Sequence, residues 1–304
     1  MKQSLFFILC FTLFLSACTE STPPESTPLE KQLMEKPTEY KVSSLNDLDA
    51  LFERFHYTLD DWKNGVSAVP RLTFQGVEPE WQKISKNMQV EKKKSIFFRL
   101  ILPLILVSNE NILHDREIVQ TAALNSQKLI QLAIKYRVIK HQNTPLTKPL
   151  RLQLLKRVNT IPPSLALAQA AEESGWGTSR FALEGNAFFG QWDFSGKGIK
   201  PKQQRKALGN YGIARFDSPL ASVEGYMLNI NTGSAYQALR DLRAEQVMNN
   251  KPFSGILLAG TLINYSERRE AYISGLRALI RYNKLEITDQ AHLSNNKLVH
   301  IVRH

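Results

Sequence analysis

The sequence predicts a mainly α-helical fold with one small β-hairpin lobe. Apolar residues recur at spacings of three and four along most of the chain, which is the period of an amphipathic helix. Residues 188–216 differ, because glycines there interrupt short aromatic or mixed runs. Such a texture is typical of loops and a hairpin, and it is the only part of the chain expected to form strands. No internal repeat points to a solenoid.

The N-terminus predicts export. Residues 1–17 contain one lysine, an apolar run from Leu5 to Leu15 and small residues before Cys18. The run is too short for a permanent membrane span, which needs about 20 residues. It resembles a bacterial lipoprotein signal with lipid attached at Cys18; the alternative is an ordinary signal peptide with a chance cysteine. We expect a lipid-anchored protein of the cell envelope, on the periplasmic face of the outer membrane if the organism is Gram-negative.

Composition limits the partners. Cys10 and Cys18 are the only cysteines, so the mature chain has no thiol left for a disulfide or a metal site. The six histidines lie far apart, and we expect neither a metal nor another cofactor. Without the signal, about 287 residues (304 − 17) carry a formal charge of +10 (11 − 1). A basic exported monomer suits anionic lipid or the carboxylate-bearing cell wall, and export argues against nucleic acid.

The first half of the chain is expected to hold a tether and a helical region. Residues 18–43 are rich in Pro, Thr, Ser and Glu, which predicts an extended tether. The helical region, 44–145, begins with one helix that Gly65 ends, followed by a loop-like stretch. From Val90 a strongly apolar core helix is expected, with a kink or break at Pro103 and a further helix running to Val138.

Residues 146–286 are expected to form the catalytic domain. A short amphipathic helix precedes a buried one, which starts at Ile161-Pro162-Pro163-Ser164 and ends at Gly175. After the hairpin, helices are expected at about 220–229, 235–248, 253–263 and 268–283. The polar tail, 287–304, is expected to be frayed.

Two adjacent glutamates, Glu172 and Glu173, end the buried helix. This position is electrostatically poor, because a helix C-terminus carries partial negative charge and the two carboxylates repel each other. They point about 100° apart, so only one can face a cleft, and periodicity does not choose between them. Burial and repulsion raise a carboxyl pKa, which suits the proton donor of glycoside hydrolysis. The alternative is that both pair with arginines such as Arg180 and serve structure.

Aromatic residues crowd the segment after the glutamates. Aromatic faces suit the apolar faces of sugar rings, although core packing is the commoner role. Trp176, Phe189 and Trp192 are therefore candidate substrate-binding residues. Asn186 is another candidate, because its amide suits an acetamido group, but it equally suits the cap of a turn.

The run PPSLALAQAAEESGWGTSRFALEGNAFFGQW resembles the signature of bacterial N-acetylglucosaminidases of glycoside hydrolase family 73. More narrowly, the chain resembles the Bax branch of that family, also through EKKKSIFFRLILPLILVSNENIL and NYSERREAYISGLRALIRYN. The resemblance implies a lysozyme-like helical domain with Glu173 as the general acid. It also implies a cleft tyrosine at Tyr265, whose alternative role is packing against the helix. A further matching element, Ser222 to Tyr226, adds Tyr226 to the substrate-binding candidates, although that element is expected to be structural.

One departure from the family concerns the second carboxylate that some relatives supply from the hairpin. Residues 196–216 contain no Asp or Glu but several lysines and arginines. Weakly supported substitutes lie outside this stretch: Asp193, Glu184, Asp217 and Glu224. The favoured hypothesis is that Glu173 works with the substrate's own 2-acetamido group, an exception to the two-carboxylate mechanism. The basic hairpin would then clamp wall carboxylates.

These observations predict a hydrolase that cleaves β-1,4 bonds after N-acetylglucosamine in peptidoglycan. A lytic transglycosylase is the enzymatic alternative, since it also relies on a single Glu before Ser. A glycan-binding or scaffolding lipoprotein without catalytic activity is the alternative from another class.

Overall fold

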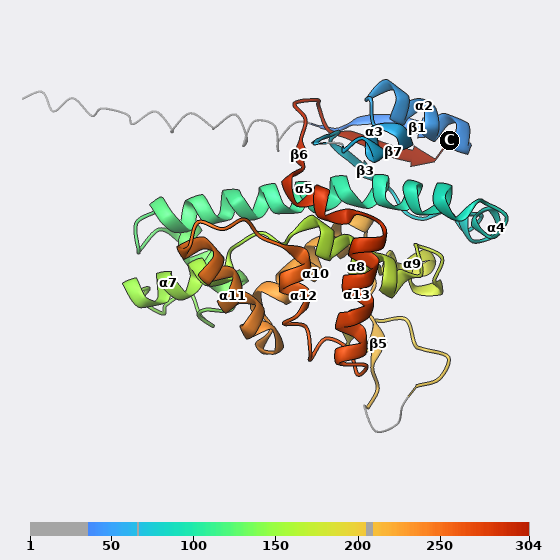
Figure 1. Ribbon diagram of the computed structural model, residues 1–304. Coiled ribbons are helices and arrows are strands. Elements are labelled where there is room, and N and C mark those ends of the chain that lie inside the picture. The colour runs from blue at the N-terminus through green and yellow to red at the C-terminus, as the bar shows by residue number, and fades with distance from the viewer. Residues whose placement is uncertain (1–35, 66, 205–208, 304) are drawn as a thin grey trace, which may run out of the picture. The chain divides into compact units, whose positions relative to one another are not determined.

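The computed structural model describes residues 36–65, 67–204 and 209–303 (Figure 1). The part of the chain from Pro37 onward forms one compact unit, which is mainly helical with small sheets, as the sequence predicts. Residues 1–35 lie outside the described residues, and with them the expected signal, the expected lipidation site Cys18 and most of the expected tether.

The longest helix, α5 (Val90–Thr121), passes through the middle of this unit (Figure 1). Its apolar stretch is long enough to cross a membrane by length and composition, but 78% of the most apolar window is buried inside the protein. That burial fits the predicted core helix. The helix continues through Pro103, so of the two predicted outcomes the break is wrong, while the kink stays a prediction. Packing on nearly every side from Ser95 to Asn109 offsets the lost hydrogen bond, which costs about 3 kcal/mol.

The buried helix α8 (Pro163–Ser174) lies at the centre of the second half of the chain. It packs against α5, α12 (Gly255–Ala259), α13 (Glu270–Tyr282) and the 3₁₀ segment η3 (Leu285–Gln290). Ten of its twelve residues are buried, as the apolar run LALAQAA predicts. Four further helices complete this half: α7 (Lys148–Arg157), α9 (Arg180–Gly185), α10 (Pro219–Thr232) and α11 (Gln237–Met248). The short 3₁₀ segment η2 (Ser234–Tyr236) joins α10 to α11.

The predicted hairpin is present after α9. Strand β4 (Trp192–Asp193) pairs antiparallel with β5 (Gly212–Ile213), and Ile199 forms an additional bridge with Ile213. The backbone N–H of Phe216 donates to the Gly185 carbonyl and so joins the end of the hairpin to α9.

The hairpin is not the only β-structure, so that part of the prediction is wrong. Strands β1 (Thr38–Val42), β7 (Val299–Arg303) and β3 (Leu72–Phe74) form a parallel sheet in the order β1-β7-β3. A second parallel pair joins β2 (Ala68–Val69) to β6 (His292–Leu293). The tail is therefore not frayed, and its last strand is the centre of a sheet. Val299 and Ile301 are buried while His300 between them is less so, which is the period of a strand.

Helix boundaries in the N-terminal region also differ from the prediction. The first expected helix is two, α2 (Leu45–Arg54) and α3 (Leu59–Lys63), and each begins with a capping box, at Ser44 and at Thr58. Helix α4 (Trp81–Lys86) occupies part of the expected loop. The helix expected to reach Val138 ends at Thr121, and α6 (Gln127–Lys135) starts anew behind Ser126, whose hydroxyl caps it.

Candidate active site

Helix α8 ends in a tight turn that places Glu173 at its last turn. Gly175 (φ 56°), Trp176 (φ 62°) and Gly177 (φ 73°) all adopt left-handed backbone conformations. The Ser174 hydroxyl accepts from Gly177 N (2.9 Å) and donates to the Ala170 carbonyl (2.6 Å), which ties the turn back to the helix. Glu173 is half-buried there.

Burial is the largest influence on Glu173 and raises the pKa of its carboxyl, and the Glu172 carboxylate raises it further. The Tyr272 hydroxyl, which donates to Oε1 at 2.9 Å, and the Arg268 guanidinium act in the opposite direction. The net shift of the pKa is upward, in the direction that the sequence predicts. A carboxyl of this kind keeps its proton to higher pH than an exposed glutamate, as a general acid requires.

A chain of hydrogen bonds runs from α10 through α8 and α13 to Glu173. The Tyr226 hydroxyl donates to Gln169 Oε1 (2.7 Å), and Gln169 Nε2 donates to the Tyr272 oxygen (3.1 Å). Tyr272 in turn donates to Glu173, as above. Tyr226 and Gln169 are completely buried, so these contacts are shielded from water.

Glu172 differs from its neighbour Glu173 in its exposure and in its hydrogen-bond partner. It is exposed, and its carboxylate pairs with Arg268 at 2.5 Å. The alternative prediction that both glutamates pair with arginines is thus confirmed for Glu172 but not for Glu173. The partner is not Arg180, which instead pairs with Glu184 (3.3 Å) and donates to the Lys200 carbonyl.

Two predicted substrate-binding residues are core residues in the structure. The rings of Phe189 and Tyr226 stack with their centroids 4.0 Å apart, and both side chains are almost fully buried. Tyr265, the predicted second catalytic residue, lies half-buried beside them; its hydroxyl donates to the Phe189 carbonyl (3.1 Å) and its ring stacks on Tyr272 (5.4 Å). These rings pack beside the end of α8 that carries Glu173.

The other aromatic and amide candidates lie in three different surroundings. Trp176 packs edge-on against Phe97 and Phe98 of α5. Asn186 caps α9 in the left-handed conformation and its Nδ2 donates to the Phe216 carbonyl, which matches the turn-cap alternative. Trp192 alone is 50% exposed, on the hairpin.

The hairpin approaches Glu173 through its backbone. Gly190 has φ 60°, and a Cβ added there would come within 3.2 Å of Glu173 Oε2. Only a residue without a side chain leaves this space open while adopting that backbone conformation without strain. Just beyond it, Trp192 stacks on Tyr211 (5.1 Å), and Phe194 next to it is 66% exposed.

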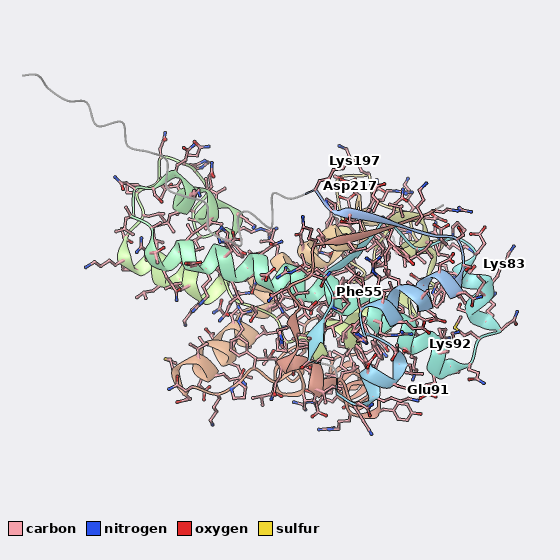
Figure 2. The ribbon with its side chains drawn as sticks, turned by 90° about the horizontal axis from the view of Figure 1, so that it is seen from above. Phe55, Lys83, Glu91, Lys92, Lys197 and Asp217 are labelled. Atoms are coloured by element: carbon pink, nitrogen blue, oxygen red, sulfur yellow. The ribbon has the colours of Figure 1, made fainter. Side chains whose placement is uncertain are left out.

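The substitute carboxylates have other partners. Asp193 accepts from the backbone and hydroxyl of Ser195 and from Gly198 N, and these bonds lower its pKa. Glu224 accepts from Asn111 of α5, in surroundings that raise its pKa through burial. Asp217 is exposed beyond the hairpin (Figure 2). The carboxylate whose charge raises the pKa of Glu173 is instead that of Glu172.

Several residues of the site were not predicted. Gln169 carried a signal, because it lies four residues before Glu173 on one helix face and is a polar residue in an apolar run. Tyr272 and Arg268 carried none, since only the packing of α13 on α8 brings them to the glutamates. Tyr236 is also close enough to feel the charge of Glu173, which contributes to the raised pKa of Tyr236 behind the larger effect of burial.

Two cavities lie elsewhere in the described part of the chain. One, of about 630 Å³, lies between α3, the start of α5 and the end of α13; the other, of about 410 Å³, lies between β1, α2, α4 and α5. Glu173 lines neither of them. Within the described residues, no group of three or more His, Cys, Asp or Glu side chains is placed to hold a metal ion.

Comparison with known proteins agrees with this geometry. Residues 149–285 match the family described as glucosaminidase, mannosyl-glycoprotein endo-beta-N-acetylglucosaminidase. Over 199 residues the chain is 30% identical to "Protein bax" of Escherichia coli (strain K12). This matched stretch covers 63% of the chain and 70% of that protein. No solved structure matches the chain. The matched region contains α8, the hairpin and α13, and the chain therefore belongs to the glucosaminidase family, whose members are glycoside hydrolases acting on glycans.

Proposed function

We propose that this protein is a peptidoglycan hydrolase, an endo-β-N-acetylglucosaminidase that cleaves β-1,4 bonds with Glu173 as general acid. The observation that carries the proposal is the half-buried Glu173 carboxyl with a raised pKa, at the end of a helix that the family model covers. A carboxyl with a raised pKa keeps its proton to higher pH and can donate it to the glycosidic oxygen as the bond breaks.

The second catalytic group in this proposal is the substrate's 2-acetamido oxygen. It attacks the anomeric carbon as the leaving group departs, and water then opens the cyclic intermediate with the Glu173 carboxylate as base. This choice is supported by the other candidate carboxylates, which have partners elsewhere: Asp193 accepts from the backbone of its own loop, and Glu224 accepts from Asn111 of α5. Tyr265 contributes by fixing the Phe189 carbonyl, and with it the start of the hairpin, beside Glu173.

The polymer would lie across the hairpin. Trp192 and Phe194 present exposed rings to sugar faces, and exposed Lys197 and Lys200 attract the carboxylates of wall peptides. Lipid attachment at Cys18, outside the described residues, would hold the enzyme at the envelope membrane facing this substrate.

Zymography on purified peptidoglycan with two isosteric variants tests the proposal. Glu173→Gln removes the acid but keeps an oxygen for the Tyr272 hydroxyl, so we expect clearing of the gel to be lost while the protein still folds and binds. Glu172→Gln makes the same chemical change at an exposed neighbour and is expected to remain active. Clearing by Glu173→Gln would contradict the assignment.

Mass spectrometry of the digested wall separates the reaction types. Products with reducing N-acetylglucosamine ends support the hydrolase, whereas anhydro-muramic ends would show a lytic transglycosylase. A wild-type protein that binds the wall without releasing products would be a glycan-binding protein instead.

A further inference from the structure

The three hydrogen bonds that link Tyr226 to Glu173 have a fixed order of donors and acceptors, and Tyr226 is the first donor. Tyr226 is 1% exposed, and burial raises the pKa of its hydroxyl well above the usual range, so the hydroxyl keeps its proton. That proton points to Gln169 Oε1, 2.7 Å away. A buried hydroxyl proton without an acceptor would be costly, which is why the direction of this first bond is determined.

Tyr226 thereby fixes the orientation of the Gln169 amide. An amide has one acceptor and one donor end, and the two ends cannot be exchanged when a neighbour requires one of them. Because Oε1 accepts from Tyr226, Nε2 must face Tyr272, whose oxygen lies 3.1 Å away. The reversed amide would place its NH₂ group against the Tyr226 proton.

The amide then determines what Tyr272 offers to Glu173. Its oxygen accepts from Gln169, so its own proton is free to point at Glu173 Oε1, 2.9 Å away. Tyr272 also keeps this proton, because burial and the Glu173 carboxylate raise its pKa above the usual range. Since Oε1 is occupied by a donor, a proton bound to Glu173 belongs on Oε2, the oxygen next to Gly190.

We infer that Tyr226 and Gln169 are positioning residues, which act through Tyr272 to place the transferable proton of Glu173 on Oε2, the oxygen that faces the hairpin at Gly190. The catalytic role in this inference rests on the proposed function. The inference gives Tyr226 a positioning role in place of the predicted contact with substrate. In the reaction the Oε2–H bond breaks as the glycosidic oxygen takes the proton, and the electron pair stays on the carboxylate.

Other groups around Glu173 must be held constant in a test. Glu172 lies on the same helix, Arg268 precedes α13, and Tyr265 and Tyr236 approach from the neighbouring segments. None of them belongs to the hydrogen bonds from Tyr226 to Tyr272, so a substitution of Tyr226 leaves each in place.

The test is the pH profile of kcat for Tyr226→Phe, with Tyr272→Phe as reference. Tyr272→Phe removes a donor that lowers the pKa of Glu173, so the alkaline limb of the profile should move to higher pH, on the order of one unit. Tyr226→Phe never touches Glu173, but it lets the amide of Gln169 reverse and accept the Tyr272 proton. We expect its alkaline limb to move in the same direction by about half that amount, with KM unchanged.

The matched control is Tyr57→Phe in the N-terminal part. Tyr57 is 0% exposed, and its hydroxyl has no hydrogen-bond partner among the described residues. The change therefore deletes the same atom from a buried site outside the hydrogen bonds that lead to Glu173. Its profile should coincide with that of the wild type. Partial unfolding of a variant would lower activity at all pH values without moving the limb.

A second readout separates this inference from the proposed function. The Glu173 carboxyl is titrated without substrate, by infrared difference spectra between each protein and its Glu173→Gln derivative. A higher midpoint in Tyr226→Phe supports the inference even if the protein cleaves no peptidoglycan. A midpoint equal to the wild type in Tyr226→Phe, together with a raised one in Tyr272→Phe, would overturn it.

Discussion

The helices that carry Glu173 and the hairpin that meets it at Gly190 hold their side chains in different ways. On the helical side, Gln169, Tyr226 and Tyr272 are buried, and each polar atom has a partner in another helix. On the hairpin, Trp192 is 50% and Phe194 66% exposed. Under the proposed function, the proton donor is held in place by the folded protein, whereas the exposed rings of the hairpin are left to adapt to the polymer.

The largest effect is expected where the two sides meet. Gly190→Ala places a Cβ 3.2 Å from Glu173 Oε2, and it strains a backbone with φ 60°. We expect kcat to fall by about 10², the cost of a small misplacement at a reacting centre. Stability should fall by about 1–2 kcal/mol, because an L residue is strained in this conformation. Wall-digestion kinetics and urea unfolding measure the two effects.

Gly196→Ala is the control for backbone strain. Gly196 also lies on the hairpin with positive φ, 83°, but nothing lies within 4 Å of an added Cβ. It should lose comparable stability and keep its kcat. Equal losses of activity in both alanine variants would show that Gly190 matters only through the fold of the hairpin.

A medium effect is expected from the exposed rings. Replacing Trp192 and Phe194 by alanine should raise KM for the polymer about tenfold and leave kcat nearly unchanged, because the rings contribute binding but no chemistry. Tyr282→Ala, which removes an 81% exposed ring at the far end of α13, is the matched variant without an expected effect. A fall in kcat without a change of KM would place the hairpin rings in the reaction itself.

A smaller effect is expected from charge. Lys197→Gln with Lys200→Gln should weaken binding to the wall a few-fold at low salt, and the difference should vanish at high salt, since exposed charges are screened. Lys83→Gln with Lys86→Gln removes two exposed lysines from α4, away from the hairpin (Figure 2). A salt dependence that is equally reduced in both pairs would mean that net charge alone, and no hairpin clamp, attracts the wall.

The helical side was easier to predict than the sheets, for a physical reason. Helix α8 carries its signals within a few residues: proline in the first turn, an apolar body and Gly175 at its end. Strand β7 pairs with β1 and β3 from the other end of the chain, so neither its position nor its burial follows from local sequence. The capping boxes at Ser44 and Thr58 were local signals that would have divided the first helix correctly.

The site shows the same limit. The helix end marked Glu172 and Glu173 together, and the raised pKa followed from burial and from the repulsion between the two carboxylates. The family resemblance chose Glu173 and added Tyr265. Tyr272 depends on the packing of α13 on α8, and the burial of Tyr226 and Phe189 depends on how α10 meets the hairpin. Residue type had assigned Phe189 to the substrate, and the family resemblance had assigned Tyr226.

The smallest expected effect concerns stability, and it sharpens the contrast between the two sides. A carboxyl whose pKa is raised by folding binds more protons in the folded state, so its contribution to stability is retained below the unfolded pKa and is lost as pH rises toward the folded one. Glu173→Gln removes that loss and should therefore increase the free energy of unfolding at pH 7. The gain should disappear in urea unfolding near pH 4. Glu172→Gln, at the exposed partner of Arg268, should show no such gain, because exposed ion pairs contribute about 0–1 kcal/mol. If Glu173→Gln were no more stable than the wild type at pH 7, the ionised Glu173 carboxylate would not destabilise the folded protein. The buried helical side would then carry no such cost, like the exposed hairpin.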